Sequence, residues 1–213
     1  MKTLLLTLFT GLFLALAAFA PAPASTDGAA PASTVLPAET ATFTIDPAHT
    51  TIGFRIRHMG IAFVEGEFDA FEGSITFNPG DLAATRAEVT VLTASIDTDV
   101  QQRDDHLRSA DFFEVETYPT MTFAATGAQP TGPHTFRLAG DLTIKGTTRE
   151  VTFDVEAAGP IPTENGQRVG FHATTVIDRR DFGITWGGEL PGGIPAIGHQ
   201  VQLVLDVEAV TGA

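Results

Sequence analysis

Apolar side chains recur at every second residue, in segment after segment, between Phe43 and Val210. A side-chain period of two is typical of β-strands that bury one face. Turn signals separate these segments, for example Asn-Pro-Gly-Asp at 78–81 and Lys-Gly-Thr at 145–147. One charged stretch, 97–110, clearly breaks the alternation and predicts a single main helix.

The alternating segments amount to roughly eight or nine strands, so the predicted fold class is all-β. A row of half-buried strands must avoid free edges, and the usual solutions are a barrel or a sandwich. The interior of an eight-stranded antiparallel barrel is filled by side chains or occupied by one slim ligand. Small residues on the inward faces favour an open interior, although glycine also serves barrel corners. These residues are Gly66, Gly73, Gly140 and Ala173.

Three segments are predicted to interrupt the strands. The alternation shifts at residues 69–71, which predicts a bulge or a kink. Residues 160–167 are predicted to be a loop. Residues 187–198 hold five glycines and two prolines, and they predict a long irregular loop.

The start of the chain has the pattern of a signal peptide, predicted at 1–20. Lys2 precedes an apolar run that ends in small residues, with cleavage after Ala20 or Ala24. The run is about 17 residues long, the lower limit for a membrane span, so a retained anchor is the alternative. An Ala/Pro-rich flexible tether is predicted at 21–42, and one folded domain at 43–210. We therefore expect a periplasmic or secreted protein.

The chain has 12 basic and 26 acidic residues, a formal net charge of −14. A surface of this charge repels phosphate backbones and anionic lipid faces, which argues against nucleic-acid binding. The chain has no cysteine, so disulfides and thiolate chemistry are excluded.

Six segments, taken together and in this order, resemble a known family. They are IGFRIRHMG at 52–60, GEF at 66–68, HLRSADFF at 106–113, YPTMTF at 118–123, GDLTIKGTT at 140–148 and ATTVIDRRDFGI at 173–184. They are similar to segments of the YceI family of periplasmic polyisoprenoid-binding proteins. The resemblance covers essentially the whole chain after the tether.

This resemblance implies an eight-stranded antiparallel up-and-down barrel, similar to lipocalins, with one main helix. It implies an exported binding protein that holds a polyisoprenoid in an apolar channel, either a quinone tail or a prenyl pyrophosphate. A homodimer is also implied, whereas an enzyme, a catalytic residue, a metal and a cofactor other than the bound lipid are not.

An isoprenoid tail lacks hydrogen-bonding groups, so apolar residues should line its channel, each contributing through buried area. For each of these residues, ordinary core packing is the alternative. The predicted ligand-binding residues are Phe54, Ile56, His58, Phe68, Phe71, Phe113, Phe123, Leu142 and Phe153. His58 alternates with Phe54 and Ile56, so it is expected inside, either as a satisfied core histidine or as a headgroup contact.

Other polar groups are predicted to be structural. Residues 103–106 are expected on a solvated helix face, with an ion pair between Arg108 and Asp111. Residues 178–181 alternate in charge and predict a salt-bridge corner at the barrel end, although Arg179 or Arg180 could instead meet a headgroup. Trp186 is either a barrel plug or the rim of a channel mouth.

Two rival functions follow from the same residues. One is a lipid-modifying enzyme on this barrel, in which His58 acts with an acidic partner. The other is a structural or stress module whose core is filled. A void below ~100 Å³ would favour the filled core, because ordinary ligand pockets are several times larger.

Overall fold

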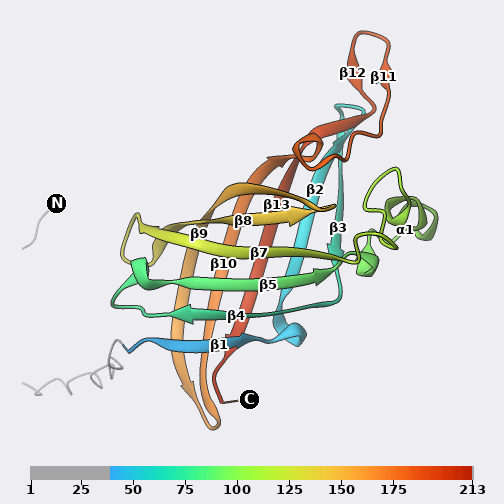
Figure 1. Cartoon of the computed structure of the whole chain (residues 1–213). Coiled ribbons are helices and arrows are strands. Elements are labelled where there is room, and N and C mark those ends of the chain that lie inside the picture. Colours follow the sequence, from blue (N-terminus) through green and yellow to red (C-terminus); the bar gives the residue numbers. More distant parts are fainter. Residues whose placement is uncertain (1–38, 213) are drawn as a thin grey trace, which may run out of the picture. The chain divides into compact units, whose positions relative to one another are not determined.

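A computed structural model describes residues 39–212 and contains a closed antiparallel barrel of eight strands (Figure 1). The strands follow one another round the barrel in this order: β1 (Ala41–Ile45), β4 (Phe71–Phe77), β5 (Arg86–Leu92), β7 (Thr120–Pro130), β8 (Thr135–Ile144), β9 (Thr147–Thr163), β10 (Gly166–Asp178) and β13 (Ile197–Val210). Pairing of Thr44 with Val210 and of Ile45 with Ala209 closes the ring. The predicted eight-stranded barrel with one helix is therefore confirmed.

The long strand β13 pairs with two strands in turn along the same edge. β1 takes its last residues, and β2 (Thr51–His58) continues along it from Asp206 to Ile197. The turn η1 (Pro47–His49) joins β1 to β2. β3 (Ala62–Phe68) then forms a hairpin with β2, and the short β6 (Ile96–Asp97) pairs with the end of β3.

The helix α1 (Gln101–Arg108) lies beside the barrel, next to β3 (Figure 1). Three short turns of 3-10 helix also connect the strands: η2 (Leu82–Ala84), η3 (Thr93–Ser95) and η4 (Arg179–Phe182). No helix among residues 39–212 has both the length and the apolar composition needed to cross a bilayer.

The helix is less solvated than its sequence predicts. Asp104 is buried and accepts a hydrogen bond from Thr98 Oγ1, and Arg103 donates to both oxygens of Thr98. Arg108 pairs with Asp105 and donates to two backbone carbonyls. The solvated face expected at 103–106 is therefore wrong in part, since Asp105 is exposed but Asp104 is buried. The Arg108–Asp111 pair is wrong, because Arg108 fastens the helix to the chain before it.

Two predicted loops are also wrong in part. Residues 160–167 are mostly strand, since β9 runs to Thr163 and β10 begins at Gly166. Within 187–198, β11 (Glu189–Leu190) and β12 (Ile194–Pro195) form a small hairpin. Proline and glycine at bulges and tight turns hid both pairings from the periodicity.

The predicted start of the domain and the predicted break in the alternation agree more closely with the structure than these two loops do. β1 begins at Ala41, two residues before the expected start of the domain. At residues 69–71 the chain passes from β3 to β4, which is the expected break in the alternation. The predicted signal peptide at 1–20 and the tether up to residue 38 lie outside the described residues.

Phenyl rings close the barrel at one end. Phe43, Phe77 and Phe136 are each 1% exposed, and Phe77 meets Phe171 edge to face at 5.1 Å between ring centroids. Edge-to-face contacts are favoured because the positive ring edge meets the negative face. A second group of buried side chains packs towards the helix end of the barrel; it includes Phe68, Ile96, Phe112 and Phe182.

Inward-facing glycines provide surfaces against which phenyl rings lie close to the wall. A Cβ atom at Gly140 would lie 2.4 Å from Phe123 Cζ, and one at Gly66 would lie 2.7 Å from Phe54 Cζ. The sequence suggested that these glycines leave empty space, but neighbouring rings occupy the positions where their side chains would be. The glycines let these rings sit back from the barrel axis, which keeps the middle open.

We predict that Gly140→Ala destabilises the barrel by about 1–3 kcal/mol, because the new methyl group meets a packed ring and a backbone oxygen. The control is Gly127→Ala, since a Cβ at Gly127 meets nothing within 4 Å. Its free energy of unfolding, measured in urea, should stay within about 0.5 kcal/mol of wild type. Equal losses for the two variants would contradict the role given to Gly140.

Candidate ligand-binding site

The barrel encloses a cavity of about 720 Å³. Its wall is largely apolar and comes from both groups of core residues and from the segment around α1. The volume is far above the limit set for a filled core and lies within the roughly 300–1,000 Å³ typical of small-molecule sites. The rival with a filled core is therefore excluded.

All but one of the predicted ligand-binding residues line this cavity. The lining members are Phe54, Ile56, His58, Phe68, Phe113, Phe123, Leu142 and Phe153. Phe71 is the exception: it is partly buried and packs against both groups of core residues instead. It is the first residue of β4, directly after the break between strands. Contact of the other eight with a ligand remains a prediction.

Three aromatic contacts hold the lining rings in place. Phe68 packs against Phe54 at 5.9 Å and meets Phe113 edge to face at 5.7 Å between centroids. Deeper in the barrel, Phe123 meets Phe153 edge to face at 5.3 Å. These contacts hold the rings against one another in the cavity wall. The rest of the wall is largely aliphatic.

Sequence reasoning missed much of that aliphatic lining. β13 contributes four inward residues in strict alternation, namely Val201, Leu203, Leu205 and Val207. The alternation had identified this segment as a strand, so these four residues could have been predicted to line the cavity. Val100, Leu107 and Phe112 also line the cavity, but they come from the helix segment, where no period of two marks an inward face.

The mouth of the cavity is marked by residues that both line it and are exposed. His58 at the end of β2, Val100 and Gln102 near the start of α1, and Trp186 meet both conditions. Trp186 packs edge to face against His106 at 4.7 Å. It therefore belongs to the rim of the channel mouth and is not a barrel plug.

His106 makes more contacts with neighbouring side chains than its sequence suggested. Its imidazole lies 2.9 Å from an oxygen of Asp111 and packs against Phe112 and Trp186. This interaction connects α1 to the loop that carries Trp186. The rim is thus built from segments more than seventy residues apart, which no local motif reveals.

Arg179 is buried and holds the rim loop to the barrel. It donates hydrogen bonds to the backbone oxygens of Ile184, Trp186 and Gly198 at 2.8–2.9 Å. Burial lowers the pKa of this guanidinium. Because its donors are committed to backbone carbonyls, Arg179 is a structural residue of the predicted corner.

The partner residues of this corner form an ion pair. Arg180 donates to Asp178 through Nε and Nη2, and its backbone N–H also donates to that carboxylate. The hydrogen bond from Arg180 is the main reason that the pKa of Asp178 falls to about 2. The salt-bridge corner predicted at 178–181 thus lies at the end of β10, next to the rim.

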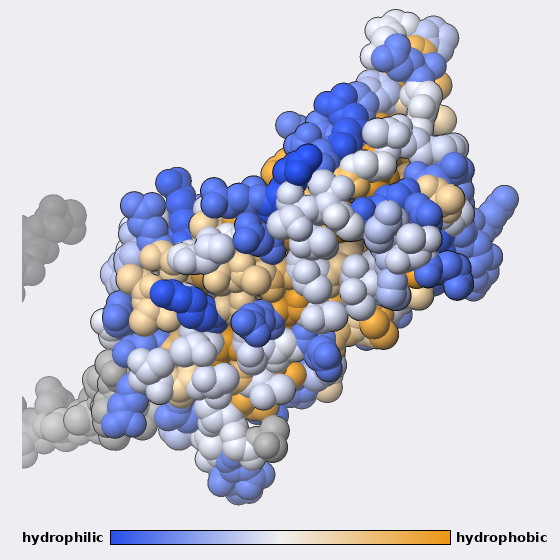
Figure 2. Space-filling model, viewed as in Figure 1, coloured by the Kyte–Doolittle hydropathy of each residue, from blue (hydrophilic) through white to orange (hydrophobic). Residues whose placement is uncertain are grey.

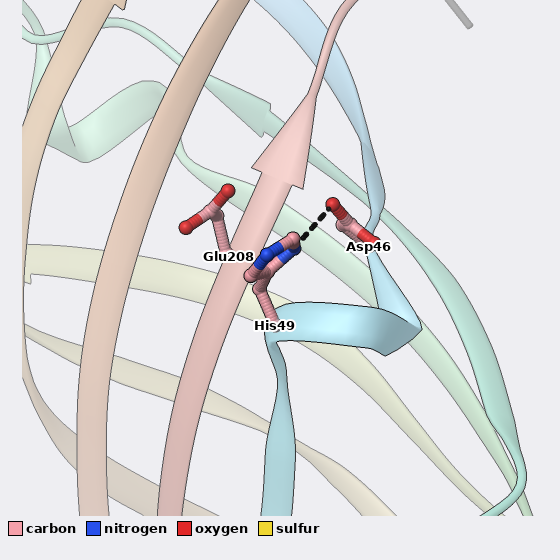
Figure 3. Close-up of side chains that lie close together, drawn as sticks. All are labelled: Asp46, His49 and Glu208. Carbon is pink, nitrogen blue, oxygen red and sulfur yellow. Dashed lines mark hydrogen bonds and ion pairs between the residues drawn. The ribbon is translucent and has the colours of Figure 1, made fainter.

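A second cluster lies where β1 gives way to β2, and it has the composition of a metal site (Figure 3). Ligand-type atoms of Asp46, His49 and Glu208 lie within 4.8 Å of one another. However, Arg168 donates to both carboxylates, so its guanidinium already supplies the positive charge. Hydrogen bonds from His49 and Arg168 lower the pKa of Asp46. The cluster fastens β10 and β13 to the end of β1, at the seam where pairing of β1 with β13 closes the barrel.

A closed antiparallel barrel around an apolar cavity is the architecture of lipocalin-like binding barrels. A YceI-like domain matches residues 43–209, so the chain belongs to the YceI family. A UPF0312 protein of Vibrio cholerae is 38% identical over 151 residues, which are 69% of this chain and 79% of that protein.

Two solved structures are similar to this barrel. BcnA of Burkholderia cenocepacia is 27% identical with a TM-score of 0.69, over 78% of this chain and 99% of that chain. A polyisoprenoid binding domain from Saccharophagus degradans is 14% identical with a TM-score of 0.58, over 81% and 99% of the two chains. At 14% identity the second likeness shows the fold alone.

We predict that Arg179→Met destabilises the protein by about 2–4 kcal/mol, because several buried carbonyls lose their donor. The matched variant is Arg180→Met, whose guanidinium is half exposed and bonds one carboxylate. Amide hydrogen exchange should rise across residues 184–198 in the first variant and much less in the second. Equal exchange in both would contradict the fastening role of Arg179.

We predict an acid-sensitive contribution from Asp178. Its pKa is lowered in the folded state, so its stabilising effect is complete above its ordinary value of 3.8 and is lost as the pH falls towards 2. The Tm advantage of wild type over Asp178→Asn should therefore shrink between about pH 5 and about pH 2. A constant difference across that range would contradict the ion pair.

Proposed function

We propose that this protein is an exported carrier that holds a polyisoprenoid in its barrel. The observation that carries the proposal is the apolar cavity of about 720 Å³, whose described rim combines the polar residues His58 and Gln102 with the apolar residues Val100 and Trp186. Membership of the YceI family, which the sequence analysis associates with polyisoprenoid binding, supports the ligand class. The predicted signal peptide supports a periplasmic or secreted location.

The cavity is suited to a long apolar tail. Its lining offers side chains from every strand of the barrel and few hydrogen-bonding groups. Each buried CH₂ contributes about 0.8 kcal/mol, so ten of them favour binding by roughly 8 kcal/mol before the costs of association and ordering. Selectivity then comes from the width and length of the lumen rather than from polar contacts.

The mouth favours a neutral headgroup, such as a quinone, over a pyrophosphate. A pyrophosphate needs several free cationic donors, and two of the three arginines that line the cavity are already committed, which leaves Arg57 alone. Arg103 bonds Thr98, and Arg179 bonds backbone carbonyls. His58 and Gln102 stay available as hydrogen-bonding groups at the rim, and a quinone carbonyl can accept one such bond.

The geometry around His58 supports binding rather than catalysis. A histidine base needs an orienting partner, usually a carboxylate within hydrogen-bond reach. Among residues 39–212, no carboxylate forms an ion pair with His58. A lipid-modifying enzyme is therefore the weaker proposal, and a headgroup contact is the role we propose for His58. The homodimer implied by the family resemblance stays a prediction.

We expect organic extraction of the purified protein to release an isoprenoid that mass spectrometry identifies. Ala173→Phe should lower the extracted amount roughly ten-fold or more, because the new ring occupies the lumen. Val176→Phe is the control, since Val176 lies on the same strand and faces outward. Thermal melting must show that both variants are folded.

Two results would contradict the carrier function. The first is a folded wild-type protein that contains no isoprenoid and takes up neither added quinone nor added prenyl pyrophosphate. The second is equal lipid content in Ala173→Phe and Val176→Phe, which would place the lipid outside the lumen. A release of prenyl pyrophosphate instead of quinone would overturn only the headgroup assignment.

A further inference from the structure

One buried hydroxyl group that faces the cavity lacks a hydrogen-bond partner. Thr85 is 1% exposed and lines the cavity, and its Oγ1 atom has no partner among residues 39–212. Most buried polar groups are paired, because an unpaired one loses its bonds to water without replacement. The other buried side-chain atom without a partner in that range is Nε of Arg55, which lies 3.6 Å from Glu65 and does not line the cavity.

Thr85 lies at the end of the cavity opposite the mouth. It connects η2 to β5, where Arg86 pairs with Thr76, so the next residues in register are Thr85 and Phe77. Phe77 belongs to the buried phenyl rings that close the barrel, and we call this the inner end of the cavity. Thr85 alternates with Ala87, which also lines the cavity, so its side chain is on the inward face of the chain.

The inner end holds no charged side chain of the part of the chain that the structure describes. The arginines and histidines that line the cavity come from β2, α1 and η4 near the mouth; they are Arg57, His58, Arg103, His106 and Arg179. Arg86 is exposed and donates only to backbone oxygens, those of Ala83 and Thr85. Figure 2 shows hydrophilic side chains, in blue, spread over the outer face of the molecule. A carboxylate or phosphate at the inner end would be buried without a counter-ion, which is strongly unfavourable.

A buried water molecule alone is a poor partner for this hydroxyl group. Such a water needs about two to four polar partners. The inner end offers the hydroxyl of Thr85 among apolar side chains such as Ile45, Ile75 and Phe136. An oxygen atom of a ligand has no such requirement, because burial of the apolar remainder of the ligand holds it in place.

We propose that the inner end is a hydrogen-bonding subsite, in which Thr85 binds one small uncharged oxygen group of the bound molecule. A threonine hydroxyl both donates and accepts, so an alcohol is its best complement. The ligand class is an apolar chain that ends in a hydroxyl group, such as a prenyl alcohol, and it enters hydroxyl first. The inference rests on the proposed use of the lumen as a lipid site and adds one polar contact to it.

The packing of the inner end favours a small group. Phe43, Phe77 and Phe136 are each 1% exposed there, and closely packed rings favour a hydroxyl group over a substituted quinone ring. A quinone would keep its headgroup at the mouth, near His58. The two ends of the cavity therefore serve two classes of ligand with the same kind of tail.

Binding of two matched chains to wild type and to Thr85→Val tests the subsite. The probes are geranylgeraniol and the hydrocarbon with the same carbon skeleton, each measured by displacement of diphenylhexatriene from the full chain freed of lipid. We expect Thr85→Val to weaken binding of the alcohol roughly five- to ten-fold. Binding of the hydrocarbon should stay unchanged. Comparing the two proteins with each probe cancels the different hydration of the probes.

The stability of the lipid-free protein gives a second readout. Thr85→Val should raise the Tm by about 2–4 °C, because a methyl group replaces an unpaired buried hydroxyl. Thr93→Val is the matched control. Thr93 is also fully buried, but its hydroxyl donates to the backbone oxygen of Tyr118 at 2.7 Å, and it does not line the cavity. That variant should lower the Tm and leave binding of both probes unchanged.

Three results would overturn the subsite and leave the carrier in place. The first is equal binding of the alcohol to wild type and Thr85→Val. The second is a fall in the Tm of lipid-free Thr85→Val like that of Thr93→Val, which would mean that the hydroxyl is already paired. The third is a density map in which the oxygen of bound geranylgeraniol lies at the mouth. If neither probe displaces diphenylhexatriene, the lumen takes up no apolar chain, and the carrier function fails together with the subsite.

Discussion

The pairing of β13 with β1 and then β2 along one edge is the constraint on which the rest of the structure depends. It closes the sheet, and a closed sheet has an interior rather than two faces. Arg168 bonds both carboxylates at the seam, where the chain leaves β1 for β2. Closure alone does not decide whether the interior is full. That depends on the rings of Phe54 and Phe123, which pack against Gly66 and Gly140 and so stay clear of the axis.

The two ends of the barrel differ in kind. Buried phenyl rings such as Phe43 and Phe136 seal one end. At the other end the wall is completed by α1, by the loop fastened through Arg179, and by the β2–β3 hairpin. These segments hold their places through hydrogen bonds to backbone carbonyls and through ring contacts. The mouth is therefore formed by tertiary contacts, whereas the barrel wall is formed by strand pairing.

This difference explains how much could be predicted from the sequence. Alternation over 201–207 and 136–144 located strands and their inward faces, because a strand's period depends only on its own residues. The roles of Asp104 and His106 could not be found in the same way, since their partners, Thr98 and Trp186, are set by the packing of α1. Phe71 was expected to line the lumen because it is aromatic. The break before β4 instead directs its side chain into the wall, where it packs against core residues.

The central claim is that the lipid lies in the lumen. An experimental density map of the protein purified with its native contents tests this claim most directly. The claim predicts one continuous, unbranched feature that runs from the rim at His58 and Trp186 to the ring of Phe136. A lumen that holds only ordered water, or one into which Phe123 and Phe153 have collapsed, would contradict it.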